Sequence, residues 1–448
     1  MPAMQLKLGF QNIEENQAEK KPDYSNGRAN KLAPQDRAFH DWYRFILSFP
    51  PHLVREYIRK FKLSPKSVVL DPFCGTGTTL VETKLAGMVA VGLEGNPFPQ
   101  FASSVKTDWN LDSDLLASHS RKIAGEVLSI LKSQGIEDNF STGDLKGEGL
   151  KTLEPAAAKL LLTNSISPLP LHKTLVLFEH LKKFEGEAFY RHALLALGSA
   201  LVFKISNLHF GPEVGVRNIK TDVPVISNWL LEIEKMANDL RKVRGESFPE
   251  AHVHLADARG FEAVEPGSVD AVITSPPYPN EKDYTRTTRL ESVLLGFVKN
   301  KEELRELKKR LVRSNTRGIY KADDDDKWIA DFPEIQRIAD EIEKRRIEMG
   351  KDSGFEKLYP RAAKLYFGGM AKHLSSLQKV LRPGAHLAYV VGDQASYLRV
   401  MIRTGQILGD IAQKLGYELV GIDLFRTRLA TATKEHLREE VVILRWKG

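Results

Sequence analysis

The chain of 448 residues has one cysteine, Cys74, so it cannot form an intramolecular disulfide. It also lacks a long apolar run. The longest, residues 193–203, is far shorter than the roughly 20 residues that a transmembrane helix needs, and it contains Gly198 and Ser199. The first residues do not show the basic segment followed by an apolar segment that marks a secretory signal. The sequence therefore predicts a cytoplasmic protein without a membrane partner.

The composition is that of an ordinary globular protein with a small basic excess. Hydrophobic residues make up 42% and charged residues 27% of the chain, which argues against a wholly disordered or fibrous protein. There are 65 Lys and Arg against 58 Asp and Glu, which gives a net charge of +7. Such an excess permits a polyanionic partner without requiring one. The length suits two or three domains, or one large domain with insertions.

Strand and helix signals alternate as in an α/β domain. A β-branched run at residues 67–70 is followed by a glycine turn, a helical segment at 78–86 and an apolar run at 89–93, and this order predicts a parallel sheet. Further strands are predicted at 253–255, 269–273, 386–391, 419–424 and 440–444, and further helices at 115–131, 171–181, 188–202, 226–240 and 365–381. We expect a mobile N-terminal arm at 1–38, sheet-forming parts at 39–98, 251–298 and 355–448, a helical insertion at 99–250, and a charged, partly basic insertion at 299–354.

Two glycines, Gly75 and Gly77, mark the turn in Asp-Pro-Phe-Cys-Gly-Thr-Gly-Thr-Thr at residues 71–79. Glycines between a strand and a helix let the backbone approach a ligand closely, so we expect a cofactor here. The lysine of a phosphate-binding loop is missing, and Leu80 stands where a dinucleotide-binding fingerprint has its third glycine. Glu94 ends the next strand, where a carboxylate can accept hydrogen bonds from ribose hydroxyls. The pattern favours a nucleoside cofactor without a pyrophosphate.

A second motif, Ser275-Pro276-Pro277-Tyr278, directly follows the predicted strand at 269–273. Ligands bind at the carboxyl ends of parallel strands, so this motif should face the same crevice as the glycine turn. The two prolines lack N–H donors and fix two φ angles, which holds the backbone carbonyls in a preset direction beside an aromatic ring. Acceptors held in this way can bind both hydrogens of an exocyclic amino group and localise its lone pair toward a methyl donor.

The motif at 71–79 resembles the S-adenosyl-L-methionine (AdoMet) motif of the amino-group DNA methyltransferases, and Ser-Pro-Pro-Tyr resembles their catalytic motif. The resemblance implies a class I AdoMet-dependent methyltransferase fold, a Rossmann-like seven-stranded mixed sheet, here with a helical and a charged insertion. It implies that Ser275 and the Pro276 carbonyl hold the amino group, with Pro277 completing the motif, and that Tyr278 stacks on a base flipped out of the duplex. The implied AdoMet-binding residues are Asp71, Phe73, Gly75, Gly77, Thr78, Glu94 and Asp257.

The partner that the resemblance implies is double-stranded DNA, with a cognate restriction or defence nuclease as a further partner. The candidate DNA contacts are Tyr284, Arg286, Arg310, Arg313 and Arg317. A phosphate track would explain the many Lys and Arg residues at 299–321, and a solvated helix with i,i+4 charge pairs would explain them equally well. The segment that recognises the DNA sequence can be residues 99–250, residues 299–354 or both. Alternatively, residues 99–250 form a helical cap packed on the sheet.

Three weaker signals leave alternatives open. Asp257 follows the third predicted strand, where the family contacts the adenine side of AdoMet, and an exposed turn aspartate is the alternative. The aromatic segments at 39–45 and 48–51 lie where the family covers the methionine end of AdoMet, or they form an N-terminal helix packed on the sheet. His252 and His254 share one face of a strand but have no third ligand nearby, and methyl transfer from a sulfonium needs no metal, so no metal site is predicted.

Within the family, serine at the head of the motif points to the N4 amine of cytosine as the methyl acceptor. The N6 amine of adenine would use the same geometry and stays open as an alternative. An RNA guanosine N2-methyltransferase is a second alternative, although such enzymes carry Asp-Pro-Pro-Tyr and a dedicated RNA-binding domain. A third is a nucleic-acid-binding subunit that uses the fold only as a scaffold, against which the intact Gly75, Gly77, Ser275 and Tyr278 argue.

Overall fold

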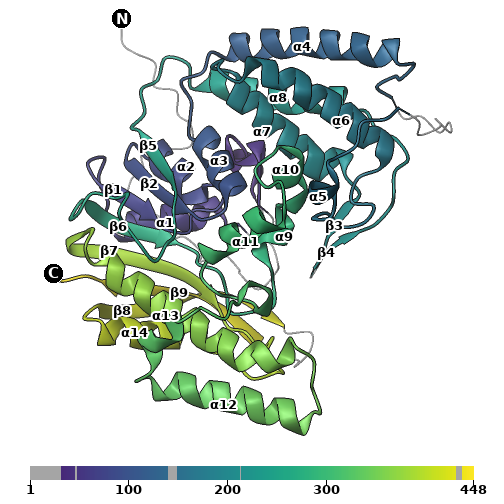
Figure 1. Ribbon diagram of the computed structural model, residues 1–448. Coiled ribbons are helices and arrows are strands. Elements are labelled where there is room, and N and C mark those ends of the chain that lie inside the picture. Colours follow the sequence, from purple (N-terminus) through teal and green to yellow (C-terminus); the bar gives the residue numbers. More distant parts are fainter. Residues whose placement is uncertain (1–31, 46–47, 140–148, 212, 430–435) are drawn as a thin grey trace, which may run out of the picture.

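The computed structural model describes residues 32–45, 48–139, 149–211, 213–429 and 436–448 (Figure 1). Most of the predicted N-terminal arm at 1–38 therefore lies outside the described residues. Of its described part, Pro34–Asp36 form a 3-10 turn, and the Asp36 carboxylate pairs with Arg55 at 2.9 Å. None of the helices in the described ranges is both long and apolar enough to span a bilayer.

The centre of the fold is a seven-stranded sheet with the strand order β5-β2-β1-β6-β7-β9-β8 (Figure 1). The strands are β1 (Val68–Asp71), β2 (Val89–Glu94), β5 (Ala251–Leu255), β6 (Val269–Thr274), β7 (Leu381–Gly392), β8 (Glu418–Leu429) and β9 (His436–Arg445). Neighbouring strands run parallel except for β9, which is antiparallel to both β7 and β8. The predicted α/β fold with a seven-stranded mixed sheet is confirmed.

Helices cover both faces of this sheet. They are α1 (Pro51–Lys60), α2 (Thr78–Leu85), α3 (Pro97–Lys106), α13 (Tyr359–Leu377) and α14 (Thr404–Lys414). The apolar side of α1, including Leu53 and Tyr57, is buried against Val69 of β1 and its neighbours. Side chains on the opposite face, such as Leu70 and Val272, pack in one core with α13 and α14. The loops at the carboxyl ends of the central strands are left to form a site.

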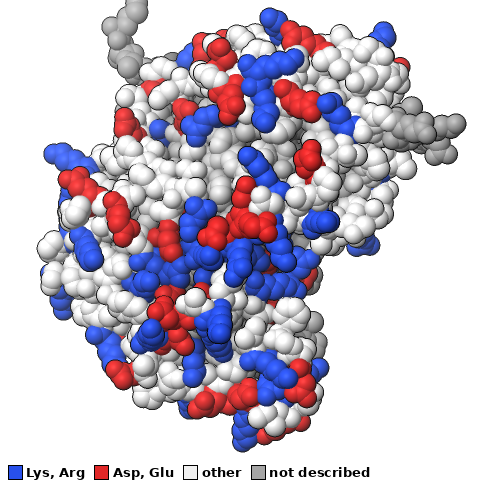
Figure 2. Space-filling view, in the orientation of Figure 1, with Lys and Arg blue, Asp and Glu red and all other residues white. Residues whose placement is uncertain are grey.

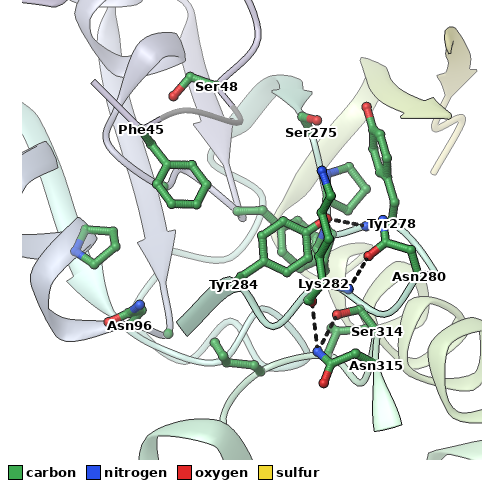
Figure 3. A pocket seen from close by; sticks show the side chains of 18 of the residues that line it. Phe45, Ser48, Asn96, Ser275, Tyr278, Asn280, Lys282, Tyr284, Ser314 and Asn315 are labelled. Atoms are coloured by element: carbon green, nitrogen blue, oxygen red, sulfur yellow. Dashed lines mark hydrogen bonds between the residues drawn. The ribbon is translucent and has the colours of Figure 1, made fainter. Parts of the chain in front are cut away.

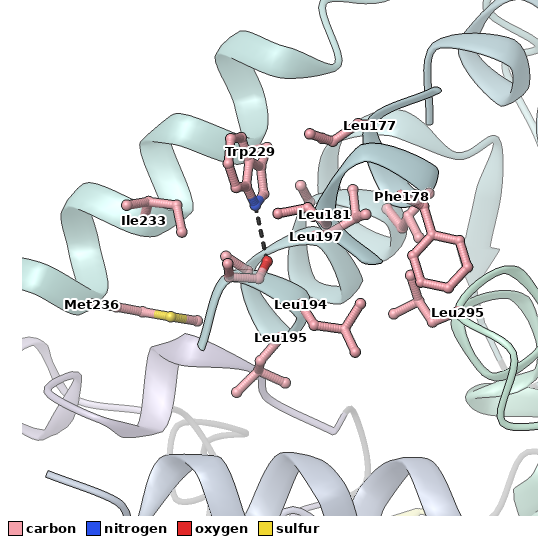
Figure 4. Close-up of a cluster of buried hydrophobic side chains, with 14 of the residues drawn as sticks. Leu177, Phe178, Leu181, Leu194, Leu195, Leu197, Trp229, Ile233, Met236 and Leu295 are labelled. Atoms are coloured by element: carbon pink, nitrogen blue, oxygen red, sulfur yellow. Dashed lines mark hydrogen bonds between the residues drawn. The ribbon is translucent and has the colours of Figure 1, made fainter. Parts of the chain in front are cut away.

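The helical insertion forms a layer of its own beside the sheet, with its own apolar core (Figures 1 and 4). Its helices are α4 (Ser113–Ser133), α5 (Pro155–Ala158), α6 (Pro168–Leu181), α7 (Tyr190–Ala200) and α8 (Ile226–Lys242). Trp229 on α8 is fully buried and donates its indole N–H to the Ala193 carbonyl on α7 at 2.9 Å. The sequence does not predict the hairpin of β3 (Leu208–Phe210) and β4 (Val214–Val216), because strands of three residues are too short to show an alternation of apolar and polar residues.

An aromatic segment ahead of α1 joins the insertion to the sheet. The indole N–H of Trp42 and the backbone N–H of Phe39 both donate to Asp239 on α8, at 3.0 and 3.1 Å. Phe39 and Trp42 are buried in the same core as Leu295, which Figure 4 shows among the side chains of the insertion. Phe39 and Trp42 of the first aromatic segment therefore pack into the core of the helical insertion, whereas an N-terminal helix packed on the sheet was predicted as one alternative.

The charged insertion contains two helices, α11 (Lys301–Lys309) and α12 (Pro333–Glu348). One side of α12 buries isoleucines such as Ile338 in the core that it shares with α13. The other side carries solvent-exposed ion pairs, among them Arg337 with Glu334 at 2.7 Å. Between the two helices the chain returns to the carboxyl ends of the strands, where it forms part of the site.

Candidate functional site

A cavity of about 570 Å³ lies where the carboxyl ends of β1, β2, β6 and β7 meet (Figure 3). Its walls come from the β1–α2 loop, the loop after β6, residues 308–318 of the charged insertion, the ends of β8 and β9, and the aromatic segment before α1. This volume is within the usual range for a small-molecule site. The position is the one at which open α/β sheets bind their ligands.

The two glycines of the β1–α2 loop have different surroundings. Gly75 lines the cavity with a φ of +51°, and a Cβ placed there would meet no atom within 4 Å. Gly77 has a φ of +82°, and a Cβ there would lie 2.5 Å from the Ser103 hydroxyl of α3. Gly75 thus leaves space for a ligand, whereas Gly77 lets the loop pack against α3.

Two buried carboxylates hold this loop in place. Asp71 lies behind the loop and accepts hydrogen bonds from the Thr274 hydroxyl at 2.6 Å and the Phe73 N–H at 3.1 Å. Glu94 accepts from the Gly75 N–H at 3.0 Å and also faces the cavity. Burial raises the pKa of Asp71 to about 6 and that of Glu94 to about 7. Asp71 therefore positions the loop, while Glu94 can in addition meet a ligand.

These residues fit a nucleoside cofactor such as AdoMet. The space above Gly75 is open, and the Glu94 carboxylate is placed to accept hydrogen bonds from ribose hydroxyls. Phe73 and Thr78 line the same cavity, as does Asn96, whose buried side-chain oxygen has no hydrogen-bond partner among the described residues. These groups offer apolar contact and hydrogen-bond acceptors without a phosphate cradle, which matches the nucleoside cofactor that the sequence predicts.

Asp257 does not lie in the cavity wall. Its carboxylate binds the Arg259 guanidinium, with 2.6 Å between the closest atoms, and Arg259 also pairs with Asp325 of the charged insertion. The neighbouring Ala258 is the residue of this turn that lines the cavity. The Asp257 carboxylate is thus paired with Arg259, and a contact of Asp257 with AdoMet stays a prediction.

The motif Ser275–Tyr278 lines the same cavity, and Figure 3 shows Ser275 and Tyr278 on the side away from Asn96. The Ser275 hydroxyl donates to the Val390 carbonyl of β7 at 3.2 Å, so its proton is engaged and its oxygen remains an acceptor. The Tyr278 backbone N–H donates to the Tyr284 hydroxyl at 3.1 Å. The Tyr278 ring packs over Gly392, where a Cβ would lie 3.1 Å from the ring. The motif therefore places a hydrogen-bond acceptor, the Ser275 oxygen, and the aromatic ring of Tyr278 in the same cavity wall.

The charged insertion braces the loop that follows Tyr278. Residues 280–283 and 308–316 are joined by hydrogen bonds and one ion pair. These are Asn280 N–H to the Ser314 carbonyl at 2.9 Å, the Asn315 amide to the Lys282 carbonyl at 3.0 Å, the Thr316 hydroxyl to Glu281 at 2.8 Å, and Lys308 to Asp283 at 2.6 Å. The sequence does not predict this role, because the two segments lie about 30 residues apart and hydrogen-bond partners at that separation leave no periodic pattern.

The predicted DNA contacts have different surroundings. Arg313 is only 4% exposed, and its guanidinium is held by Asp323 through two bonds of 2.8 Å and by backbone carbonyls. Arg286 and Arg317 lie outside the cavity wall and face Glu213 near the tip of the β3–β4 hairpin, at 3.6 and 4.0 Å. Arg313 is thus engaged inside the protein, which leaves it no donor for phosphate in this conformation.

Arg310 and Tyr284 line the cavity itself, together with Phe45 and Ser48 from the segment before α1 (Figure 3). Tyr284 belongs to the short helix α9 (Tyr284–Thr287), which is followed by α10 (Arg289–Leu294). Figure 2 shows Lys and Arg side chains, interspersed with acidic ones, in a band across the face where α9 and α11 lie. The cavity thus opens beside a surface that is rich in cations. Among the described residues, no cluster of three or more His, Cys, Asp or Glu could hold a metal ion.

The strand order of the mixed seven-stranded sheet, with a glycine turn after β1, is that of a class I AdoMet-dependent methyltransferase fold. The profile of a family described as DNA methylase matches residues 9–98. The type II methyltransferase M.BsoBI of Geobacillus stearothermophilus is 25% identical over 90% of this chain and 83% of its own length. The type II methyltransferase M.AvaI of Nostoc sp. is 24% identical over 91% of this chain and 84% of its own length. The chain is thus similar to the amino-group DNA methyltransferases, whose members take their methyl group from AdoMet.

Replacing Gly75 with valine is expected to weaken AdoMet binding by about tenfold to 100-fold, since the side chain fills space that the cofactor needs. Isothermal titration calorimetry measures the change. Gly87→Val is the matched control, because Gly87 has a φ of +75° and an open Cβ position but lies outside the cavity wall. Both variants lose about 1–2 kcal/mol of stability from the left-handed backbone. Equal AdoMet affinity in the two would show that Gly75 does not face the cofactor.

Proposed function

We propose that this protein transfers the methyl group of AdoMet to the N4 amine of cytosine in duplex DNA, with the target base flipped into the cavity. The observation that carries this proposal is the shared cavity, whose lining includes Gly75 and Glu94 as well as Ser275, Pro276 and Tyr278. The match to the DNA methylase profile and the similarity to type II methyltransferases support DNA as the substrate. The basic band beside the cavity is a suitable surface for the phosphates of a duplex.

The residues of the catalytic loop prepare the amine for attack. AdoMet supplies an electrophilic methyl group when it is bound. The lone pair of an exocyclic amine is delocalised into the base, so the amine is a weak nucleophile until its hydrogens are held. The Ser275 oxygen, whose own proton is engaged by Val390, accepts one N–H, and the Pro276 carbonyl accepts the other. Because both acceptors are fixed before the base arrives, they require little reorganisation during the reaction.

Cytosine is proposed over adenine because serine heads the catalytic motif. The test is to express the protein in a bacterial host without DNA methyltransferases and to analyse the nucleosides of its genomic DNA by mass spectrometry. N4-methylcytosine is the expected product. N6-methyladenine would retain the mechanism and overturn the choice of base, and methylated nucleosides in RNA alone would overturn the choice of DNA. Host DNA from cells expressing Ser275→Ala controls for background.

Tyr278→Ala is expected to weaken DNA binding by about 1–3 kcal/mol, since the ring would no longer stack on the flipped base. AdoMet affinity should stay unchanged, because Tyr278 belongs to the loop after β6 and not to the β1–α2 loop that carries Gly75. Fluorescence anisotropy with labelled DNA and calorimetry with AdoMet measure the two affinities. Tyr278→Phe is the control and should bind DNA like the wild type. Equal losses for both ligands would contradict a stacking role.

A type II methyltransferase is the protective partner of a restriction nuclease in the systems that this class name denotes. We therefore propose a cognate nuclease as a second partner of this protein, on the strength of the names of its relatives. Restriction fragments of host DNA before and after expression test the protective effect. Methylated sites that become resistant to one nuclease specificity are the expected result, and methylation scattered over unrelated sequences would argue against such a partner.

A further inference from the structure

Most cations in the wall of the cavity are already paired. Lys308 binds Asp283 at 2.6 Å, and Arg313 binds Asp323. Arg426 and Arg428, at the end of β8, share the Glu439 carboxylate at 2.6 and 3.6 Å. Among the described residues, only Lys282 and Arg310 of the cavity lining have no carboxylate within 4.0 Å. These two cations are therefore the ones that a substrate can engage without breaking an existing ion pair.

Lys282 and Arg310 lie in different parts of the cavity wall. The backbone carbonyl of Arg310 lies next to Gly95, directly after the Glu94 carboxylate, so Arg310 is on the cofactor side. Lys282 belongs to the loop that carries Tyr278. Burial and the nearby Arg428 lower the pKa of its ammonium, and the carboxylates of Glu213 and Glu439 oppose this shift. Glu439 also packs against Gly392, the residue under the Tyr278 ring. Lys282 therefore lies on the side of the cavity that takes the base.

The backbone of Lys282 is fixed in both directions. Its N–H donates to the Asn280 side chain at 2.9 Å, and its carbonyl accepts from the Asn315 amide at 3.0 Å. The half-buried side chain points into the cavity in the direction of Ser275 (Figure 3), and the described residues provide no hydrogen-bond acceptor for its ammonium. A fixed, unpartnered donor beside the amine-holding group is arranged to meet an acceptor on the substrate.

We propose that Lys282 is a specificity-determining residue that donates a hydrogen bond to the ring carbonyl, O2, of the target cytosine. The inference rests on the proposed function. When Ser275 and Pro276 hold the N4 amine, the remaining Watson–Crick edge of cytosine presents N3 and O2, which are both acceptors. Adenine held by its N6 amine presents N1 followed by a C–H and offers no carbonyl. A donor that reaches O2 therefore favours cytosine, as a site built around one hydrogen bond disfavours a ligand that lacks it.

The test compares Lys282→Met, Lys282→Gln and wild type for methyl transfer from labelled AdoMet to DNA of the methyltransferase-free host. Methionine keeps the length and apolar stem but cannot donate, whereas glutamine donates without a charge. We expect Lys282→Met to lower kcat/KM for DNA by about tenfold to 100-fold and Lys282→Gln to recover part of this loss. AdoMet affinity and the salt dependence of DNA binding should stay unchanged. Lys132→Met, at an exposed position on α4, is the matched control.

Two results would overturn the inference. If Met and Gln are equally impaired and the slope of log affinity against log salt falls by about 0.9, the ammonium contacts a phosphate instead of the base. If Lys282→Met matches the wild type in kcat/KM, or loses AdoMet affinity to the same degree, the ammonium does not read the substrate. N4-methylcytosine from the wild type in either case leaves the proposed function intact. N6-methyladenine from the wild type would reject the cytosine proposal itself.

Discussion

Ser275→Ala is expected to lower the rate of methyl transfer by about 100-fold to 1,000-fold, because one of the two fixed acceptors for the amine is lost. The variant keeps Pro276 and loses the hydrogen bond from the Ser275 hydroxyl to the Val390 carbonyl. AdoMet affinity should therefore be that of the wild type. Single-turnover transfer of labelled methyl groups measures the rate, and calorimetry measures the cofactor affinity.

Ser275→Asn provides the matched comparison, because an asparagine oxygen is also an acceptor. We expect Asn to restore part of the rate that Ala loses. A fully active Ser275→Ala enzyme would contradict the assignment and leave the Pro276 carbonyl as the acceptor. A loss of AdoMet binding in the same variant would indicate instead that the carboxyl end of β6 has moved.

Arg313→Met is expected to reduce the free energy of unfolding by about 3–5 kcal/mol, because Asp323 would be left as a buried, unpaired carboxylate. The Asp323 side chain is only 11% exposed and retains only the Tyr320 backbone N–H as a donor at 2.7 Å. Urea denaturation measures the loss. The double variant Arg313→Met with Asp323→Leu should recover much of it, since neither buried charge then remains.

The same variants separate a structural role from a DNA contact. Arg317→Met is the matched control, because Arg317 is 37% exposed and its nearest carboxylate lies 4.0 Å away, so its loss should cost at most about 1 kcal/mol. If Arg313 only braces the cavity wall, folded Arg313→Met protein keeps the salt dependence of DNA binding. A stable variant with a reduced salt slope would show that Arg313 leaves Asp323 and binds a phosphate.

The local part of the site was predictable from the sequence. Gly75 and Ser275 each follow a buried strand within a few residues, so their places at the carboxyl ends of β1 and β6 follow from chain order. Four helices of the insertion, α4, α6, α7 and α8, were also predictable from apolar spacing, with differences of a few residues at their ends, whereas the four-residue α5 was not. The hairpin that brings Glu213 to the cavity was not, because its strands have three residues each.

The role of the charged insertion could not be read from its composition. Its cations suggest a phosphate track or a solvated helix, yet Lys308 and Arg313 form ion pairs that hold the cavity wall. The aromatic segment before α1 likewise divides its residues, with Trp42 in the core and Phe45 in the cavity. In both segments the role of each residue depends on which other residues the fold brings close to it. The charge or apolarity of the residue alone does not predict that role.

By itself, the sequence determined the sheet, the glycine loop after β1 and the motif that we propose to hold the amine, since each depends on residues adjacent in the chain. The tertiary structure alone decided which cations form ion pairs within the protein and which remain available to a substrate. Lys282 and Arg313 are both cations in the cavity wall, but only Arg313 has a carboxylate beside it. The physical reason is that an ion pair depends on distance in space, and for residues joined only by folding that distance is set by the packing of the whole chain.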